Sequence, residues 1–155
     1  MKRHTGKWYG VMLHHTAGNT NEKIEQIRNY HIYHNKWGDI GYHYVINIDT
    51  ENKKSNIVKG RSTVYAGAHA GVDKYNNGYI GVCIPGNYDK NKIPEWLYNQ
   101  LLGHIAHIMK KHDCYGLLGH KEIHATACPG RYINLDKMRY DLSVKLKKSV
   151  KPIKL

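Results

Sequence analysis

The stretch that decides the fold is YIGVCIPG at residues 79–86, together with the segment that begins at Pro94. Residues 79–84 form an unbroken apolar run, which predicts a strand buried in a sheet, and Pro85 and Gly86 stop it. Pro94 sits where a helix takes its first residue, because its missing N–H costs nothing there. The apolar residues that follow recur on one helical face and predict an amphipathic helix: Leu97, Leu101, Ile105 and Ile108.

Strands and helices alternate on both sides of this unit. Further strands are expected at residues 8–14, 42–48 and 117–120, with a short one at 64–66. A further helix is expected to follow cap candidates at residues 19–21 and to end near residue 35, and another is expected at 135–142. This alternation predicts an α/β fold, with a central mixed β-sheet flanked by helices. There is no internal repeat, so we expect a single domain over residues 1–146 and a basic C-terminal tail or linker stub over residues 147–155.

The protein is strongly basic. Its 155 residues include 24 Lys and Arg against 12 Asp and Glu, which gives a formal net charge of +12. Such an excess predicts anionic partners, either nucleic acid or a phosphate-rich polymer of the bacterial wall. Composition alone does not choose between them. The sequence has no arginine-rich run and no base-stacking aromatic pattern, so nucleic acid is not the expected partner.

The cysteines and the amino terminus bear on the compartment. Cys83, Cys114 and Cys128 form an odd set without a C-x-x-C pair, so at least one thiol is free and a reducing compartment is the simpler interpretation. Residues 10–13 are too short an apolar stretch for a signal peptide, and no run approaches the ~18 apolar residues of a membrane span. We therefore expect synthesis in the cytoplasm without a signal peptide.

Two segments far apart in the chain carry side chains suited to a metal. His14 ends one predicted strand, His120 ends another, and Cys128 follows in a loop braced by Pro129. Two imidazoles and a thiolate are a ligand set of catalytic zinc, which keeps a fourth position open for water. The chain has 12 histidines, so spacing alone does not settle the site. His15 competes with His14, since neighbouring side chains on a strand point to opposite faces and only one can reach the metal.

The blocks around these residues resemble the zinc-dependent N-acetylmuramoyl-L-alanine amidases, a family that includes the amidase-type bacteriophage lysozymes and the animal peptidoglycan recognition proteins. The similar blocks occur in the family's order from about Trp8 to Leu135, which is most of the chain. They are HHTAG at 14–18, WGDIGYHY at 37–44, GAHA at 67–70, YIGV at 79–82, GNYD at 86–89 and GHKEIHATACPG at 119–130.

The resemblance implies both a metal site and an activity. It implies that one Zn²⁺ ion is bound by His14, His120 and Cys128, and it selects His14 over His15. It also implies an open groove above the metal, and a peptidoglycan substrate that is cut at the amide between N-acetylmuramic acid and L-alanine. The protein is therefore expected to be a cell-wall lytic hydrolase. The sequence does not identify its general base.

Further residues are expected in the groove. Tyr42 matches the family's catalytic tyrosine, and its phenol would donate a hydrogen bond to the attacking water or to the developing oxyanion. Thr126 falls where the phage lysozymes carry a lysine and the recognition-protein amidases a threonine, so a hydroxyl would assist there without a fixed charge. Three more residues are expected to contact substrate at the groove, with His124 on its rim: Asn87, Tyr88 and His124. His69, flanked by small residues in GAHA, is expected on the groove floor, where it would either contact substrate or support the metal ligands from behind, with a purely structural role as the alternative.

Two other classes of function are alternatives. One is a peptidoglycan-binding module without activity, because recognition proteins that lack a zinc ligand are inactive; here all three ligands are present. The other is a basic nucleic-acid-binding protein, which the net charge of +12 motivates. The small size, the charge and the missing signal peptide favour a monomeric phage or prophage endolysin. Such a protein would reach the wall at lysis and bind the phosphates of its teichoic acids.

Overall fold

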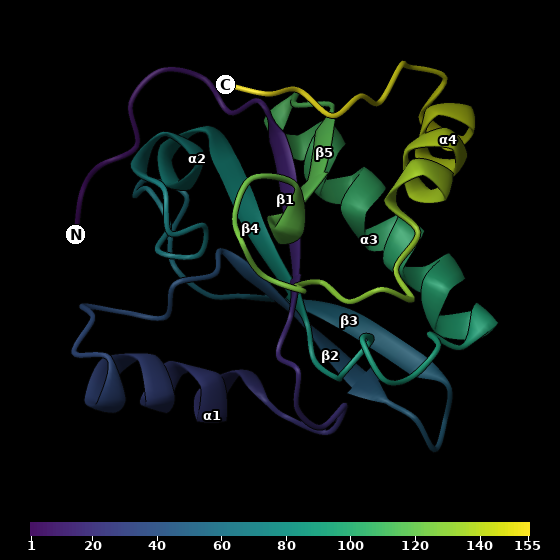
Figure 1. Ribbon diagram of the computed structural model, residues 1–155, viewed down its shortest axis with the longest axis horizontal. Helices are drawn as coiled ribbons and strands as arrows, with labels where there is room; N and C mark the ends of the chain where they lie inside the picture. Colours follow the sequence, from purple (N-terminus) through teal and green to yellow (C-terminus); the bar gives the residue numbers. More distant parts are fainter.

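A computed structural model describes all residues from 1 to 155 and contains one five-stranded sheet (Figure 1). The strands follow the order β3-β2-β4-β1-β5 across the sheet. The pair β2 and β3 is antiparallel and every other pair is parallel, so the predicted mixed sheet is confirmed. The strands are β1 at Gly10–His15, β2 at Tyr44–Asp49, β3 at Lys54–Lys59, β4 at Tyr79–Ile84 and β5 at Gly116–Gly119.

Helices cover both faces of the sheet, as Figure 1 shows, with α3 and α4 on one side and α1 and α2 on the other. Strand β1, between β4 and β5, divides its side chains between these layers. Val11 and Leu13 join the main core under α3 and α4, whereas Met12 packs with Tyr75 of α2. The helices are α1 at Ile24–Asn29, α2 at Asp73–Gly78, α3 at Glu95–His112 and α4 at Leu135–Leu146, with a π-helical turn at Tyr30–His34 after α1 and a 3-10 turn at His120–Glu122 after β5.

The alternation along β1 has a direct consequence for the two adjacent histidines at its end. His14 points to the same face as Met12, and its ring lies 5.2 Å from that of Tyr42. His15 points to the α3 side, where its Nδ1 accepts a hydrogen bond of 3.1 Å from the backbone N–H of Tyr88. Opposite directions of neighbouring side chains thus separate the two imidazoles, as expected for a strand.

Two elements differ from the sequence prediction. The expected strand at 64–66 is wrong, because that segment makes only an isolated bridge between Tyr65 and Arg3. The strand lies instead at Lys54–Lys59, whose sequence KSNIVK is polar because it forms an exposed edge of the sheet. The short helix α2, DKYNNG, was also missed. Its Asn and Gly residues favour helix weakly, and burial of Tyr75 against the sheet compensates.

The starts of two helices and the course of the C-terminal residues differ from expectation for local reasons. The helix expected after the cap candidates at 19–21 begins at Ile24, because a turn at residues 20–21 precedes it and Lys23 is its N-cap. Pro94 is the N-cap of α3, with an extended backbone (φ −60°, ψ 146°), and not the first helical residue. Residues 147–155, expected as a tail or linker, lie against the domain: Val150 is buried, and the hydroxyl of Tyr79 donates to the carbonyl of Ile153 at 2.6 Å. None of the helices has the length and apolarity needed to cross a membrane.

Candidate metal centre

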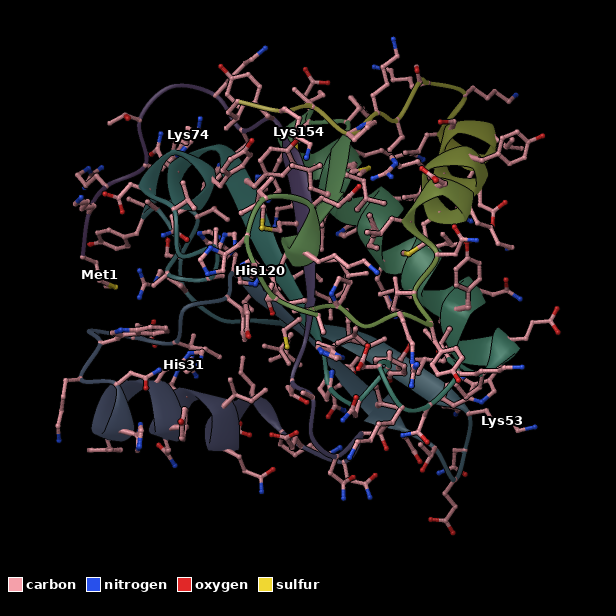
Figure 2. All side chains as sticks on the ribbon, viewed as in Figure 1. Met1, His31, Lys53, Lys74, His120 and Lys154 are labelled. Atoms are coloured by element: carbon pink, nitrogen blue, oxygen red, sulfur yellow. The ribbon has the colours of Figure 1, made fainter.

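The structure brings His14, His120 and Cys128 together, with their candidate ligand atoms all within 4.8 Å of one another. His14 is 1% exposed at the end of β1. Its Nδ1 lies 3.6 Å from the Sγ of Cys128. His120 follows β5 directly, near the centre of the molecule (Figure 2). Two neighbouring parallel strands therefore deliver the two imidazoles to one edge of the sheet, and the loop after β5 delivers the thiol.

The loop that carries Cys128 folds back onto the strand ends through backbone contacts. The N–H of Lys121 donates to the carbonyl of Cys128 at 2.7 Å, and the N–H of His15 donates to its Sγ at 3.4 Å. Gly130, with φ +107°, lies so close to the chain that a Cβ there would stand 2.3 Å from the carbonyl carbon of Tyr88. Only glycine allows this approach, and the approach fixes the end of the loop.

Ion pairs of the buried Arg139 anchor the strand that precedes His120. Glu122 accepts a hydrogen bond from the N–H of Gly119 at 2.9 Å and faces the guanidinium of Arg139 at 3.0 Å. Arg139 also donates to the carbonyl of Leu117 in β5 at 3.0 Å. Helix α4 thereby holds β5 and the first turn after it in place, which positions His120.

The three residues offer the donor set of a tetrahedral zinc ion, and one pair of them has its spacing. The group as a whole spans up to 4.8 Å, so the ligand atoms must move closer together when a metal binds. With Zn–N of about 2.0 Å and Zn–S of about 2.3 Å, the ligand atoms of such a centre lie roughly 3.3–3.8 Å apart. The 3.6 Å between His14 Nδ1 and Cys128 Sγ falls in this range. The Nε2 of His120 lies 2.8 Å from the carbonyl of Ala70, which accepts its proton, so Nδ1 is the nitrogen left with a lone pair.

Protonation also suits the donor set. Burial, followed by the neighbouring imidazoles of His69 and His120, holds the pKa of His14 well below its usual range. Burial likewise lowers the pKa of His120, so both rings are in the neutral form that binds a metal. Burial raises the pKa of the Cys128 thiol to about 11, so a metal must displace its proton.

Tyr42 lies beside the ligand group, where the resemblance placed a catalytic tyrosine. It borders a cavity of about 470 Å³ that extends toward α1, with Thr16, Glu22 and Tyr30 among the lining residues. Burial, and then the thiols of Cys83 and Cys128, hold the pKa of Tyr42 well above its usual range. The phenol therefore keeps its proton at neutral pH and is a hydrogen-bond donor next to the ligand group.

Three of the other residues expected in the groove are at least partly accessible to solvent. Thr126 and His124 are exposed on the loop, where the Thr126 Oγ1 accepts from the N–H of Cys128 at 3.2 Å and the His124 ring stacks on His120 at 5.3 Å. The Asn87 amide donates to the carbonyl of Ala17 at 3.3 Å and ties the two loops beside the ligand group together.

Two of the expected substrate contacts are not available to a ligand. Tyr88 is 2% exposed in the main core, and its hydroxyl donates to the carbonyl of Pro85 at 2.8 Å. His69 is also buried, beneath His14, and both of its ring nitrogens have partners inside the protein. Burial therefore argues against substrate contact by Tyr88, whereas the position of His69 agrees with the alternative of a residue that supports the ligands from behind. The glycines of GAHA and GNYD are small because these two rings pack against them: a Cβ at Gly67 would meet His69, and a Cβ at Gly86 would meet Tyr88.

One residue near the ligand group, Glu22, is not among those that the sequence predicts. Glu22 accepts hydrogen bonds from the Thr16 hydroxyl at 2.8 Å and from the Asn19 N–H at 2.9 Å, and it lines the cavity next to Tyr42. The threonine of HHTAG followed six residues later by an acid was the only available signal. Both contacts fix the loop after β1, so Glu22 shapes the wall of this cavity.

Comparison with known proteins agrees with this geometry. Residues 4–131 match the family described as N-acetylmuramoyl-L-alanine amidase. Peptidoglycan-recognition protein SC1a of Drosophila melanogaster is 32% identical over 133 residues, which cover 79% of this chain and 68% of the relative. Peptidoglycan-recognition protein SD of Drosophila simulans is 30% identical over 130 residues, covering 77% of this chain and 66% of the relative.

Solved structures share the fold. The crystal structure of Drosophila peptidoglycan recognition protein SD superposes with a TM-score of 0.73 at 25% identity, covering 90% of this chain and 83% of that one. The amidase LysC from Clostridium intestinale gives a TM-score of 0.73 at 23% identity, and the match covers 96% of this chain and 94% of that one. With its sequence match and its His-His-Cys group, the chain belongs to the N-acetylmuramoyl-L-alanine amidase family.

Acid is expected to destabilise the fold through a buried histidine near this site. His43 is 1% exposed; its Nε2 donates to the carbonyl of Tyr65, and its Nδ1 accepts from the N–H of Gly81. Burial lowers its pKa from 6.5 to about 4, so between these values the unfolded chain binds a proton that the folded chain does not. The stabilisation is complete above pH 6.5 and is lost as the pH falls to about 4, by up to about 1.4 kcal/mol per pH unit.

Urea unfolding measured at several pH values tests this expectation. His43→Gln should reduce the slope of unfolding free energy against pH in that window, whereas the same change at exposed His34 should leave it intact. An identical slope in the wild type and in His43→Gln would contradict the assignment.

Proposed function

We propose that this protein hydrolyses the amide between N-acetylmuramic acid and L-alanine in bacterial peptidoglycan, with one zinc ion held by His14, His120 and Cys128. The observation that carries the proposal is the convergence of these ligand atoms within 4.8 Å, next to the phenol of Tyr42. Membership of the amidase family supports the choice of the muramyl–alanine amide as the bond that is cut. The names of the Drosophila relatives support peptidoglycan as the ligand. A His₂Cys set leaves a position open, which a purely structural zinc site lacks.

When bound, the zinc supplies a Lewis acid for the scissile carbonyl and acidifies water. The chain's own residues provide the rest. Tyr42 donates a hydrogen bond toward the oxygen on which negative charge develops, because its phenol stays protonated and lies beside the ligand group. Thr126, exposed on the same loop as Cys128, offers a second hydroxyl at the rim.

A chelator experiment tests the proposal. Purified protein incubated with excess chelator should lose the ability to solubilise peptidoglycan, and added Zn²⁺ should restore it. Binding of peptidoglycan without cleavage in zinc-loaded protein would favour the alternative of a recognition module. Cleavage that persists in chelator would exclude a zinc-dependent mechanism.

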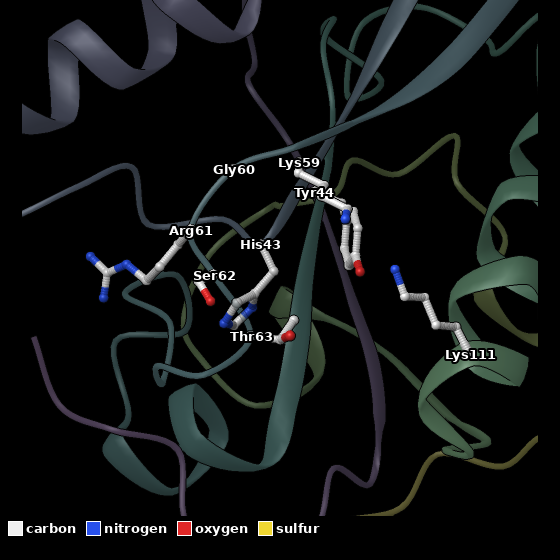
Figure 3. A pocket seen from close by; sticks show the side chains of 8 residues that line it. All are labelled: His43, Tyr44, Lys59, Gly60, Arg61, Ser62, Thr63 and Lys111. Carbon is white, nitrogen blue, oxygen red and sulfur yellow. The ribbon is translucent and has the colours of Figure 1, made fainter.

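We also propose that anionic polymers of the wall, such as teichoic acids, bind the basic surface. A cavity of about 240 Å³ lies where β2 begins and β3 ends (Figure 3), and no acidic residue lines it. Lys59 and Lys111 are exposed at its edge, form no ion pair and lie with Tyr44 on one side of the cavity. Arg61 points away, because its guanidinium donates to backbone carbonyls including that of Ala66 at 3.0 Å. The free ammonium groups are thus the two lysines.

Neutralising this pair should weaken retention on teichoic-acid-bearing wall. The double change Lys59→Gln and Lys111→Gln should reduce retention several-fold more than Lys145→Gln with Lys147→Gln, which removes equal charge elsewhere. Retention should also fall as salt rises, because the screening length shrinks from about 10 Å at 0.1 M to about 3 Å at 1 M. If the two double variants lost the same amount of retention, the binding site would not be localised at Lys59 and Lys111. Tighter binding to DNA than to wall at physiological salt would favour the nucleic-acid alternative.

The proposed setting is a monomeric endolysin of phage or prophage origin that is made in the cytoplasm and reaches the wall at lysis. The likeness in fold to the Clostridium intestinale amidase, which spans nearly all of both chains, is compatible with this setting. Protein expressed inside a bacterium should leave the wall intact until the membrane is permeabilised. Wall loss that precedes permeabilisation would contradict it.

A further inference from the structure

One loop contacts the outer nitrogen of both candidate metal-binding histidines. The Nδ1 of His69 lies 2.9 Å from the Nε2 of His14, and the carbonyl of the next residue, Ala70, lies 2.8 Å from the Nε2 of His120. The His14 contact is on the side of the ring away from Cys128, because its other nitrogen, Nδ1, lies 3.6 Å from the Cys128 Sγ. The His120 contact occupies Nε2 and leaves Nδ1 for a metal. The segment GAHA therefore supports the ligand pair from behind.

The partners of His69 determine where its proton lies. Its Nε2 is 3.0 Å from the carbonyl of Tyr79, which can only accept, so Nε2 carries the proton. Its Nδ1 is then an acceptor, and the Nε2 of His14 must donate to it. The Nδ1 of His14, which lies 3.6 Å from Cys128 Sγ, is left with a free lone pair. A chain of two hydrogen bonds from the backbone of β4 thus fixes the tautomer of His14.

The surrounding sequence is built to accommodate the His69 ring. A Cβ at Gly81, in the middle of the buried strand β4, would lie 2.5 Å from the Cδ2 of His69. A Cβ at Gly67 would lie 2.4 Å from the same atom. Glycine weakens a strand interior, and its presence often marks close approach of another group. Here that group is the imidazole of His69.

A single side chain holds the loop in this position. The Oδ1 of Asn76, on α2, accepts from the N–H of His69 at 2.9 Å and from the N–H of Ala70 at 2.8 Å. The backbone carbonyl of Asn76 accepts from the N–H of Gly67 at 2.9 Å. The missed helix α2 therefore fixes the two groups that orient His14 and His120.

We propose that the GAHA loop, fixed by Asn76, sets the tautomers of both metal-binding histidines, with His69 and Asn76 as positioning residues. This inference rests on the proposed zinc site. Groups that orient metal ligands from behind typically contribute about 10–100-fold to metal affinity. Since neither residue touches substrate, their changes should act on metal affinity and on ring orientation first.

Two measurements on the whole protein test the proposal. In metal-free wild type, ¹H–¹⁵N spectra of the histidine rings should show the proton of His14 on Nε2. Competition with a chelator should show that His69→Leu and Asn76→Leu weaken Zn²⁺ binding by about 10–100-fold. His69→Asn and Asn76→Asp keep an oxygen acceptor near the original position and should recover part of the affinity. His112→Leu, which removes a half-buried imidazole that contacts Tyr44, is the control and should bind zinc normally.

A His14 proton on Nδ1 in metal-free wild type would overturn the proposal, as would unchanged zinc affinity in a folded His69→Leu. If the leucine variants do not fold, the wild-type spectrum alone decides. If wild-type protein binds no zinc, the proposed function fails, and the spectrum still reports whether His69 fixes the tautomer.

Discussion

Replacing Cys128 by alanine should abolish cleavage of the muramyl–alanine amide while the protein remains folded. The thiol supplies one of three ligand atoms, and two imidazoles alone hold zinc weakly. We expect the rate of Cys128→Ala to fall by at least roughly 10³-fold, which corresponds to a loss of about 4 kcal/mol of transition-state stabilisation. Zinc content by elemental analysis and amide cleavage on purified wall should fall together.

Cys114→Ala is the matched control, because Cys114 is a buried thiol in the main core, away from the ligand group. It should lower the unfolding temperature and leave zinc content unchanged. Full zinc content and normal cleavage in Cys128→Ala would contradict the assignment of the ligand.

Tyr42→Phe should lower kcat by about 10²–10³-fold, the usual cost of removing one donor to a developing oxyanion. The change removes only the hydroxyl, and no ligand atom belongs to Tyr42, so zinc content should stay at the wild-type level. Steady-state kinetics on a soluble muramyl peptide, together with zinc analysis, measure both quantities.

Tyr44→Phe controls for loss of a phenol nearby. The Tyr44 hydroxyl bonds to His112 on the α3 side of the sheet and does not face the ligand group, so kcat should be unchanged. Loss of zinc in Tyr42→Phe would make that tyrosine structural, and an unchanged kcat would remove it from the mechanism.

The sequence predicts the buried elements of this fold well, because burial leaves a direct pattern. The run at 79–84 and the helical stripe after Pro94 both appear in the structure as β4 and α3. The edge strand Lys54–Lys59 escapes prediction because one side of it faces water and its composition is that of a loop. Helix α2 escapes because its stability comes from Tyr75 packing and not from its own residues.

The three candidate zinc ligands can be predicted from the sequence, because their side chains are of the types that bind zinc. The roles of the residues around them depend on how side chains pack in space, which the spacing of residues along the chain does not reveal. His14, His120 and Cys128 meet as the resemblance implied. For His69 the sequence left open whether it contacts substrate or supports the ligands, and the structure has it behind His14, because Gly81 leaves room for its ring under the strand. Asn76 gave no signal at all, since its importance comes from two backbone N–H groups in a distant loop.

The most direct test of the central claim is the identity of the new amino terminus released from purified peptidoglycan. Wall digested by zinc-loaded protein should release stem peptides that begin with L-alanine, with no increase in reducing sugar ends. The same digestion in chelator, or with Cys128→Ala, should release none. New termini at another residue, new reducing ends, or alanine release that continues without zinc would contradict a zinc-dependent N-acetylmuramoyl-L-alanine amidase.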